Sequence, residues 1–163
     1  MKPIILTYGM GIGPEISLRA LQAYNSDRNI ILMGRRSSLQ QASELTGIKL
    51  DMLRVEYTND QEEAAEVAAI RIAAQMCLKG EAAALVTGPI HKRQLADKGF
   101  AFSGHTDFLQ NICSVPETVM SFVGGDFKVC LVTTHMPIMQ VSSSLSIDKI
   151  VQIVTIASTC FKR

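Results

Sequence analysis

The sequence predicts an α/β fold, because short apolar runs typical of buried strands alternate with longer segments of helical periodicity. Clusters of Gly, Pro and polar residues separate the two kinds of segment. The predicted strands cover residues 3–7, 30–33, 53–57, 83–86, 119–122 and 128–132. In an open α/β sheet, ligands bind beyond the carboxyl ends of the strands, so the loops that follow these runs are the first candidates for a site.

Helices are expected between and after these strands. They are expected at residues 15–24, 37–45 and 60–79, and from Ser146 or Asp148 through Ile156. Ser37 is a suitable N-cap for the second helix, and Gly47 is suited to end it.

The segment at residues 60–79 shows the clearest helical pattern. Asp60 is a suitable N-cap, and Glu62 and Glu63 would favour the positive end of the helix dipole. Apolar residues recur at spacings of three and four and form one stripe, which consists of Val67, Ile70, Ala74 and Cys77. Lys79 and Gly80 supply a C-terminal stop.

The composition argues against several classes of protein. Of the 163 residues, 47% are hydrophobic and 19% are charged, which predicts a packed core rather than disorder. The net charge is +1 and the basic residues form no stripe, so neither a nucleic-acid surface nor a nucleic-acid partner is expected. The sequence shows no signal peptide and no apolar stretch of membrane-spanning length, so a cytoplasmic protein is expected.

The four cysteines form no C-x-x-C pair and sit among apolar or small neighbours. This pattern predicts buried free thiols rather than a zinc site or a disulfide framework. The cysteines are Cys77, Cys113, Cys130 and Cys160.

A glycine-rich segment at residues 9–15 separates the first strand from the first helix. Glycines let the backbone approach a ligand closely, and the start of a helix favours an anion. The spacing matches neither the G-x-G-x-x-G dinucleotide fingerprint nor a Walker loop. A tight turn with Pro14 at the first helical position is an equally good interpretation of this segment.

A second polar segment, residues 87–92, follows the strand at residues 83–86. Its side chains Thr87, His91 and Lys92 have the chemistry to hold a phosphate or a carboxylate. The alternative is a helix start with Pro89 at the first position and Lys92 in solvent.

Three polar residues, His105, Thr106 and Asp107, lie between Gly104 and the apolar pair that begins at Phe108. His105 and Thr106 can each hydrogen-bond a hydroxyl or a phosphate. The structural alternative is that Thr106 or Asp107 caps a helix that begins at Phe108.

His135 lies in the segment at residues 133–137, directly after the strand at residues 128–132. A neutral histidine at the carboxyl end of a strand suits a metal ligand or an acid–base group. A lone histidine is also a common structural residue, and no second ligand lies at helical spacing from it.

Four segments together resemble the 4-hydroxythreonine-4-phosphate dehydrogenase family of pyridoxine biosynthesis. The sequence at residues 11–16 is similar to the family's G-I-G-P-E motif, and residues 83–92 are similar to its A-L-V-T-x-P-I-x-K segment. Residues 104–109 are similar to its G-H-T-E-F-L motif, and residues 129–137 to its strand that ends in T-T-H-x-P. The four segments occur in the family's order.

The resemblance implies an α/β/α sandwich like that of isocitrate and isopropylmalate dehydrogenases, with NAD bound without a Rossmann fingerprint. It implies that His105 and Thr106 contact a small phosphorylated substrate. It also implies that His135 is one of three histidine ligands to a divalent metal, which could be Zn, Mg or Co. The implied reaction oxidises 4-phosphohydroxy-L-threonine with NAD and is followed by decarboxylation. The resemblance assigns no catalytic base and no NAD contact.

Members of this family are about twice as long as this chain. Residues 1–163 are therefore expected to form the N-terminal portion of a truncated dehydrogenase fold, with the substrate side, one metal ligand and no C-terminal portion. A homodimer with a shared active site is the implied assembly. The alternatives are a non-catalytic remnant or interaction module of the same fold, a related dehydrogenase for another phosphorylated hydroxy acid, and an unrelated phosphate-binding domain.

Overall fold

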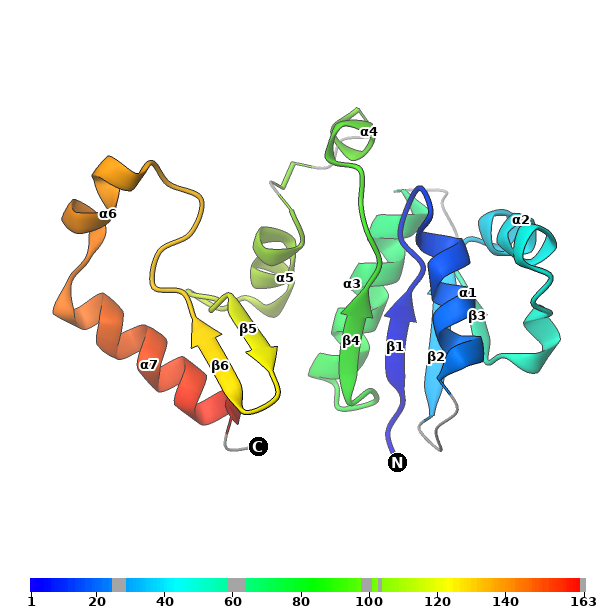
Figure 1. The fold of residues 1–163 in the computed structure, drawn as a ribbon, viewed down its shortest axis with the longest axis horizontal. Coiled ribbons are helices and arrows are strands. Elements are labelled where there is room, and N and C mark those ends of the chain that lie inside the picture. The colour runs from blue at the N-terminus through cyan, green and yellow to red at the C-terminus, as the bar shows by residue number, and fades with distance from the viewer. Residues whose placement is uncertain (25–28, 59–63, 98–100, 103, 162–163) are drawn as a thin grey trace. The chain divides into compact units, whose positions relative to one another are not determined.

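The computed structural model describes residues 1–24, 29–58, 64–97, 101–102 and 104–161 (Figure 1). The chain divides into two compact units, Met1–Ser114 and Val115–Arg163. Each unit has its own sheet, and each is considered by itself below.

The first unit contains a four-stranded parallel sheet in the order β3-β2-β1-β4. Its strands are β1 (Ile4–Thr7), β2 (Ile30–Gly34), β3 (Val55–Tyr57) and β4 (Ala84–Thr87). Ile4 pairs with Ile30 on one side and with Ala84 on the other. All four strands were predicted, and the parallel sheet confirms the α/β fold class. The strand order reverses between β1 and β4, which makes their carboxyl ends the switch point of the sheet.

Helices cover both faces of this sheet (Figure 1). The helices of this unit are α1 (Gly13–Ala23), α2 (Arg36–Thr46), α3 (Ala65–Leu78), α4 (Lys92–Ala96) and α5 (His105–Cys113), with a short 3-10 helix η1 (Leu50–Met52). Ile5 and Ile31 pack with Ala69 of α3 on one face. On the other face Leu32 packs with Leu18 of α1, because successive side chains of a strand point to opposite faces.

The second unit consists of a hairpin and two helices. The antiparallel strands β5 (Ser121–Gly124) and β6 (Phe127–Cys130) are followed by α6 (Ile138–Ser144) and α7 (Ile147–Phe161). The hairpin was predicted, but β5 begins two residues later than expected. The backbone N–H of Lys149 donates to the Ser146 hydroxyl at 3.1 Å, which confirms Ser146 as the residue that opens α7.

Several expected helix boundaries were wrong. Ser37 lies inside α2, where Arg35 occupies the cap position, although Gly47 does end this helix in the left-handed conformation. The helix expected from residue 60 begins at Ala65, and the expected cap Asp60 lies outside the described residues. Helix α6 was not expected at all, because its seven residues are too few to show a clear period.

Among the described residues, no single helix is long and apolar enough to cross a membrane. Helices α6 and α7 reach that length and composition only as a pair, which bends by 93°.

Candidate functional site

The loops after β1 and β4 lie side by side at the switch point of the sheet. The backbone N–H of Met10 donates to the carbonyl of Pro89 at 2.6 Å, and the N–H of Gly88 donates to the carbonyl of Thr7 at 2.9 Å. Two of the segments that sequence reasoning singled out, residues 9–15 and 87–92, are therefore joined by backbone hydrogen bonds. This is the position at which open α/β sheets hold ligands.

Glycines allow this close approach of the two loops. Gly9 has a φ of +72°, and a Cβ built on it would lie 2.6 Å from the carbonyl oxygen of Pro89. A Cβ on Gly88 would lie 2.7 Å from the carbonyl oxygen of Thr7. The sequence suggested that glycines let the backbone approach a ligand. At Gly9 and Gly88 they instead let the two loops approach one another.

His91 holds the start of the short helix α4. Its Nδ1 accepts a hydrogen bond from the backbone N–H of Gln94 at 3.4 Å, and its own N–H donates to the sulfur of Met10 at 3.2 Å. The helix begins at Lys92, three residues after Pro89, so the expectation of Pro89 at the first helical position was wrong. His91 consequently has a structural role at the same switch point.

His105 and Thr106 form the first turn of α5, with Gly104 as the residue before it. The alternative in which Thr106 or Asp107 caps a helix that begins at Phe108 was therefore wrong, and the N-cap position is held by Gly104, which has no side chain to cap with. His105 is half-buried and Thr106 is exposed. Thr106 therefore presents its hydroxyl to solvent at the positive end of a nine-residue helix.

Helix α5 is anchored beside the loops of the switch point. Phe108 is buried in a cluster with Val67 and Ile70 of α3, and Met10 and Ile90 pack against the same cluster. The structure thereby brings α5 into the same hydrophobic cluster as both loops.

His135 belongs to the second unit and lies five residues beyond the end of β6. Its side chain is exposed, and its backbone adopts the left-handed conformation with a φ of +54°. A non-glycine residue in this conformation is uncommon and is a reasonable sign of a functional constraint.

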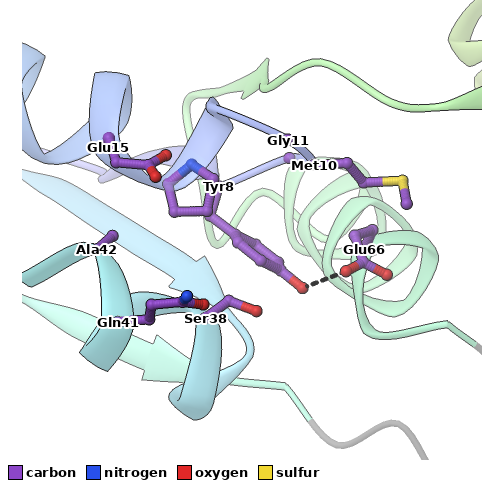
Figure 2. Close-up of a pocket in the computed structure, with 10 residues that line it drawn as sticks. Tyr8, Met10, Gly11, Glu15, Ser38, Gln41, Ala42 and Glu66 are labelled. Carbon is purple, nitrogen blue, oxygen red and sulfur yellow. Dashed lines mark hydrogen bonds between the residues drawn. The ribbon is translucent and has the colours of Figure 1, made fainter. Parts of the chain in front are cut away.

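A pocket of about 150 Å³ lies between the β1–α1 turn, α2 and the start of α3 (Figure 2). It was not expected from the sequence. We call it the Glu66 pocket, and its lining residues are Tyr8, Gly9, Met10, Gly11, Pro14, Glu15, Ser38, Gln41, Ala42 and Glu66.

The centre of the Glu66 pocket is a buried hydrogen bond. The hydroxyl of Tyr8 donates to Oε1 of Glu66 at 2.8 Å, and both side chains are buried (Figure 2). Burial raises the pKa of Tyr8 well above its ordinary value, and the hydrogen bond and charge of Glu66 raise it further, against a smaller opposing effect of Arg35. Tyr8 therefore remains a protonated donor.

The pair joins residues 58 positions apart, which is why sequence reasoning missed it. Two signals were present in the sequence. Glu66 stands directly before the apolar stripe of α3, and Tyr8 directly follows the predicted strand at residues 3–7. Neither pattern indicates which residue forms the other half of the hydrogen bond.

The described residues do not by themselves form the expected metal site. In the part of the chain that the structure describes, no three His, Cys, Asp or Glu side chains gather closely enough to hold an ion. The Glu66 pocket is also smaller than the roughly 300–1,000 Å³ of typical ligand sites, so it does not fit a whole dinucleotide.

The fold and the paired loops define an α/β domain with a candidate site at the switch point of its parallel sheet. Among the solved structures that share this fold, three are named as 4-hydroxythreonine-4-phosphate dehydrogenases. The putative 4-hydroxythreonine-4-phosphate dehydrogenase from Salmonella typhimurium has a TM-score of 0.83 at 21% identity, and the alignment covers 99% of this chain and 60% of that one. The enzyme from Klebsiella pneumoniae has a TM-score of 0.83 at 23% identity, with 99% and 58% covered.

The chain belongs to the family described as pyridoxal phosphate biosynthetic protein PdxA, whose model matches residues 10–163. A curated 4-hydroxythreonine-4-phosphate dehydrogenase from Sulfurihydrogenibium sp. (strain YO3AOP1) is 30% identical across 99% of this chain and 58% of the relative. One from Marinobacter nauticus (strain ATCC 700491 / DSM 11845 / VT8) is 40% identical over 93 residues, which are 57% of this chain and 28% of the relative. The chain thus spans at most about three fifths of the length of these relatives.

Proposed function

We propose that this chain forms the substrate-side, N-terminal portion of an NAD-dependent 4-hydroxythreonine-4-phosphate dehydrogenase in pyridoxal phosphate biosynthesis. The observation that carries the proposal is the family match over residues 10–163, together with relatives named for this activity. In the proposed reaction, the 3-hydroxyl carbon of 4-phosphohydroxy-L-threonine gives a hydride to NAD and the hydroxyl gives up its proton. The resulting β-keto acid then loses carbon dioxide.

We assign substrate contact to His105 and Thr106. Both belong to the first turn of α5, where backbone N–H groups and the helix dipole favour a phosphate. Helix α5 shares its hydrophobic cluster with Met10 and Ile90 from the two switch-point loops. A phosphate bound at the start of α5 would therefore lie on a helix that packs in the same cluster as the two switch-point loops.

For His135, we propose a role as one ligand of a divalent metal, with Zn, Mg and Co as the candidates. Its exposure and its left-handed backbone support this assignment. We assign the remaining metal ligands to no residue of this chain, since the described residues contain no group of three possible ligands. We also assign no NAD contact.

A homodimer in the cytoplasm is the proposed form of the protein, with an active site shared between two copies. Exposed apolar side chains of the second unit support association, and among them are Phe122, Phe127, Ile147 and Val154.

A second candidate is a non-catalytic member of the family that retains the substrate side. The observation that favours it is the incomplete metal site in the described part of the chain. A dehydrogenase for another phosphorylated hydroxy acid would use the same residues with a different substrate.

Calorimetric titration of the 163-residue chain with 4-phosphohydroxy-L-threonine tests the substrate assignment. We expect binding that His105→Ala weakens about tenfold or more, because a charge-assisted hydrogen bond contributes about 1.5–3 kcal/mol. Asn111→Ala is the matched control and should leave the affinity unchanged, since Asn111 is exposed near the opposite end of the same helix. Equal losses in both variants, or no binding by the parent chain, would reject the substrate assignment.

NADH formation separates the candidate functions. The assay uses NAD and each metal in turn, with the chain alone and with the C-terminal portion of a relative supplied. The dehydrogenase proposal expects turnover only in the second case. Substrate binding without turnover in either case favours the non-catalytic candidate. Turnover of a different phosphorylated hydroxy acid favours a dehydrogenase with another substrate.

A further inference from the structure

The Glu66 pocket has the properties of a ligand site that the proposed dehydrogenase activity does not use. It lies beside β1 and β2 and is lined by the starts of three helices, α1, α2 and α3. Figure 2 shows Glu15, Tyr8 and Ser38 around the same space, with the Tyr8 hydroxyl directed at Glu66. The site residues His105, Thr106 and His135 do not line it.

One carboxylate oxygen of Glu66 has no hydrogen-bond donor among the residues that the structure describes. The side chain is 8% exposed, and its Oε1 is engaged by Tyr8. Its Oε2 is buried and accepts no hydrogen bond from any described residue. A buried carboxylate oxygen without a donor is costly, so a donor from outside the chain is expected there.

Glu15 repeats this feature on the opposite wall of the pocket. Its Oε2 is also buried and has no hydrogen-bond partner among the described residues. Two acceptors from different helices therefore line the same pocket, and Ser38 and Gln41 of α2 belong to its lining as well.

The balance of charge favours a cation. The helix starts would attract an anion, but each of α1 and α3 carries a glutamate in its first turn that opposes one. Arg35 is close enough to act on Tyr8 and contributes one positive charge against two negative ones. A metal ion is disfavoured, because no group of three acidic, His or Cys side chains gathers in the described part of the chain.

We propose that the Glu66 pocket binds a small organic cation with a primary ammonium group, which donates a hydrogen bond to Oε2 of Glu66. The volume of about 150 Å³ equals that of a cavity that admits benzene, so the ligand has about six non-hydrogen atoms or fewer. The inference is independent of the proposed dehydrogenase activity.

The test is a titration of the ¹⁵N-labelled chain with protonated ethanolamine, followed by the amide signals of Gly9, Gly11 and Glu66. Ethylene glycol replaces the ammonium group by a neutral hydroxyl at nearly the same size, and magnesium chloride probes a metal ion. We expect a saturable shift with ethanolamine alone. Glu66→Gln should weaken it about tenfold or more.

Glu44→Gln is the matched control, because Glu44 is an exposed carboxylate on α2 that does not line the pocket. It should leave the ethanolamine affinity unchanged. If Glu66→Gln does not fold, Glu15→Gln replaces it and should weaken binding in the same way. The proposal is overturned if ethanolamine gives no saturable shift, as expected for a pocket that holds water only, or if ethylene glycol or magnesium shifts the same signals equally.

Discussion

Tyr8 illustrates how one residue connects the strand that precedes it with a helix far along the chain. Its ring is buried at the end of β1, and its backbone N–H donates to the carbonyl of Met33 at 3.1 Å. The hydroxyl reaches Glu66 at the start of α3. The phenol is therefore both part of the core and the donor that satisfies half of a buried carboxylate.

Tyr8→Phe should lower the free energy of unfolding by about 1–3 kcal/mol, because it leaves the Glu66 carboxylate without its donor. Urea unfolding followed by circular dichroism measures the change. Tyr24→Phe is the control, since Tyr24 is half exposed and should change stability little. Equal effects of the two substitutions would show that the buried hydrogen bond contributes nothing.

The same pair predicts how stability depends on alkaline pH. The pKa of Tyr8 is raised in the folded protein above its ordinary value of 10.0, so unfolding favours the ionised phenol. The stability from this group is fully present below about pH 10 and is lost as the pH rises above that value. The unfolding free energy of Tyr8→Phe should therefore fall less steeply than that of the parent chain between about pH 9 and 11. Parallel slopes would contradict this prediction.

The cysteines should differ in reactivity although none is in a disulfide. Burial raises the pKa of the Cys77 thiol, and the neighbouring Cys113 raises it further. Cys160 is exposed and the other three cysteines are only partly buried, so the expectation of four buried thiols was wrong, whereas the expectation of free thiols was right. Alkylation with iodoacetamide, followed by peptide mass spectrometry, should modify Cys160 first and Cys77 much later, because the thiolate is the nucleophile. Early modification of Cys77 in the folded chain would refute the assignment.

At the scale of elements, the end of β2 is shaped by its contact with Tyr8. A Cβ on Gly34 would lie less than 3.0 Å from ring carbons of Tyr8. A side chain at position 34 would therefore collide with the Tyr8 ring, so the close packing at this point depends on Gly34.

Gly34→Ala should destabilise the protein by about 1–3 kcal/mol, because the added methyl overpacks the core against the Tyr8 ring. Gly124→Ala is the matched control at the end of β5, where a Cβ would meet no atom within 4 Å. The midpoints of urea denaturation compare the two variants. A Gly34→Ala chain as stable as Gly124→Ala would mean that the ring moves aside at no cost.

The boundaries of the elements show where local pattern was sufficient. The strands of the first sheet were predicted because continuous apolar runs mark buried parallel strands. Helix starts were less well predicted, since α2, α3 and α5 show no side-chain cap in the structure. Capping rules alone therefore do not mark where these helices begin.

For the whole molecule, the second unit leaves many apolar side chains exposed. Val154 on α7 is 58% exposed, and Phe127 on β6 is 74% exposed. Such side chains gather at interfaces, which is the physical support for the proposed homodimer.

Light scattering coupled to size exclusion should show a dimer that Val154→Glu shifts toward monomer, because a charge would be buried at the interface. Leu45→Glu is the matched control, since Leu45 is an exposed apolar residue on α2 of the first unit, at 66% exposure. A chain that is monomeric at micromolar concentration, or a dimer indifferent to Val154→Glu, would contradict the proposed interface.

The sequence by itself determined the α/β class, the strands of the first sheet and the segments at residues 9–15 and 87–92, because apolar periodicity and glycine placement are local signals. It also carried the ordered motifs that indicate the family. Only the tertiary structure decided that β1 and β4 are neighbours and that Tyr8 meets Glu66. These contacts join residues far apart in the chain, and they depend on how the sheet is ordered and where α3 begins, which no local pattern specifies.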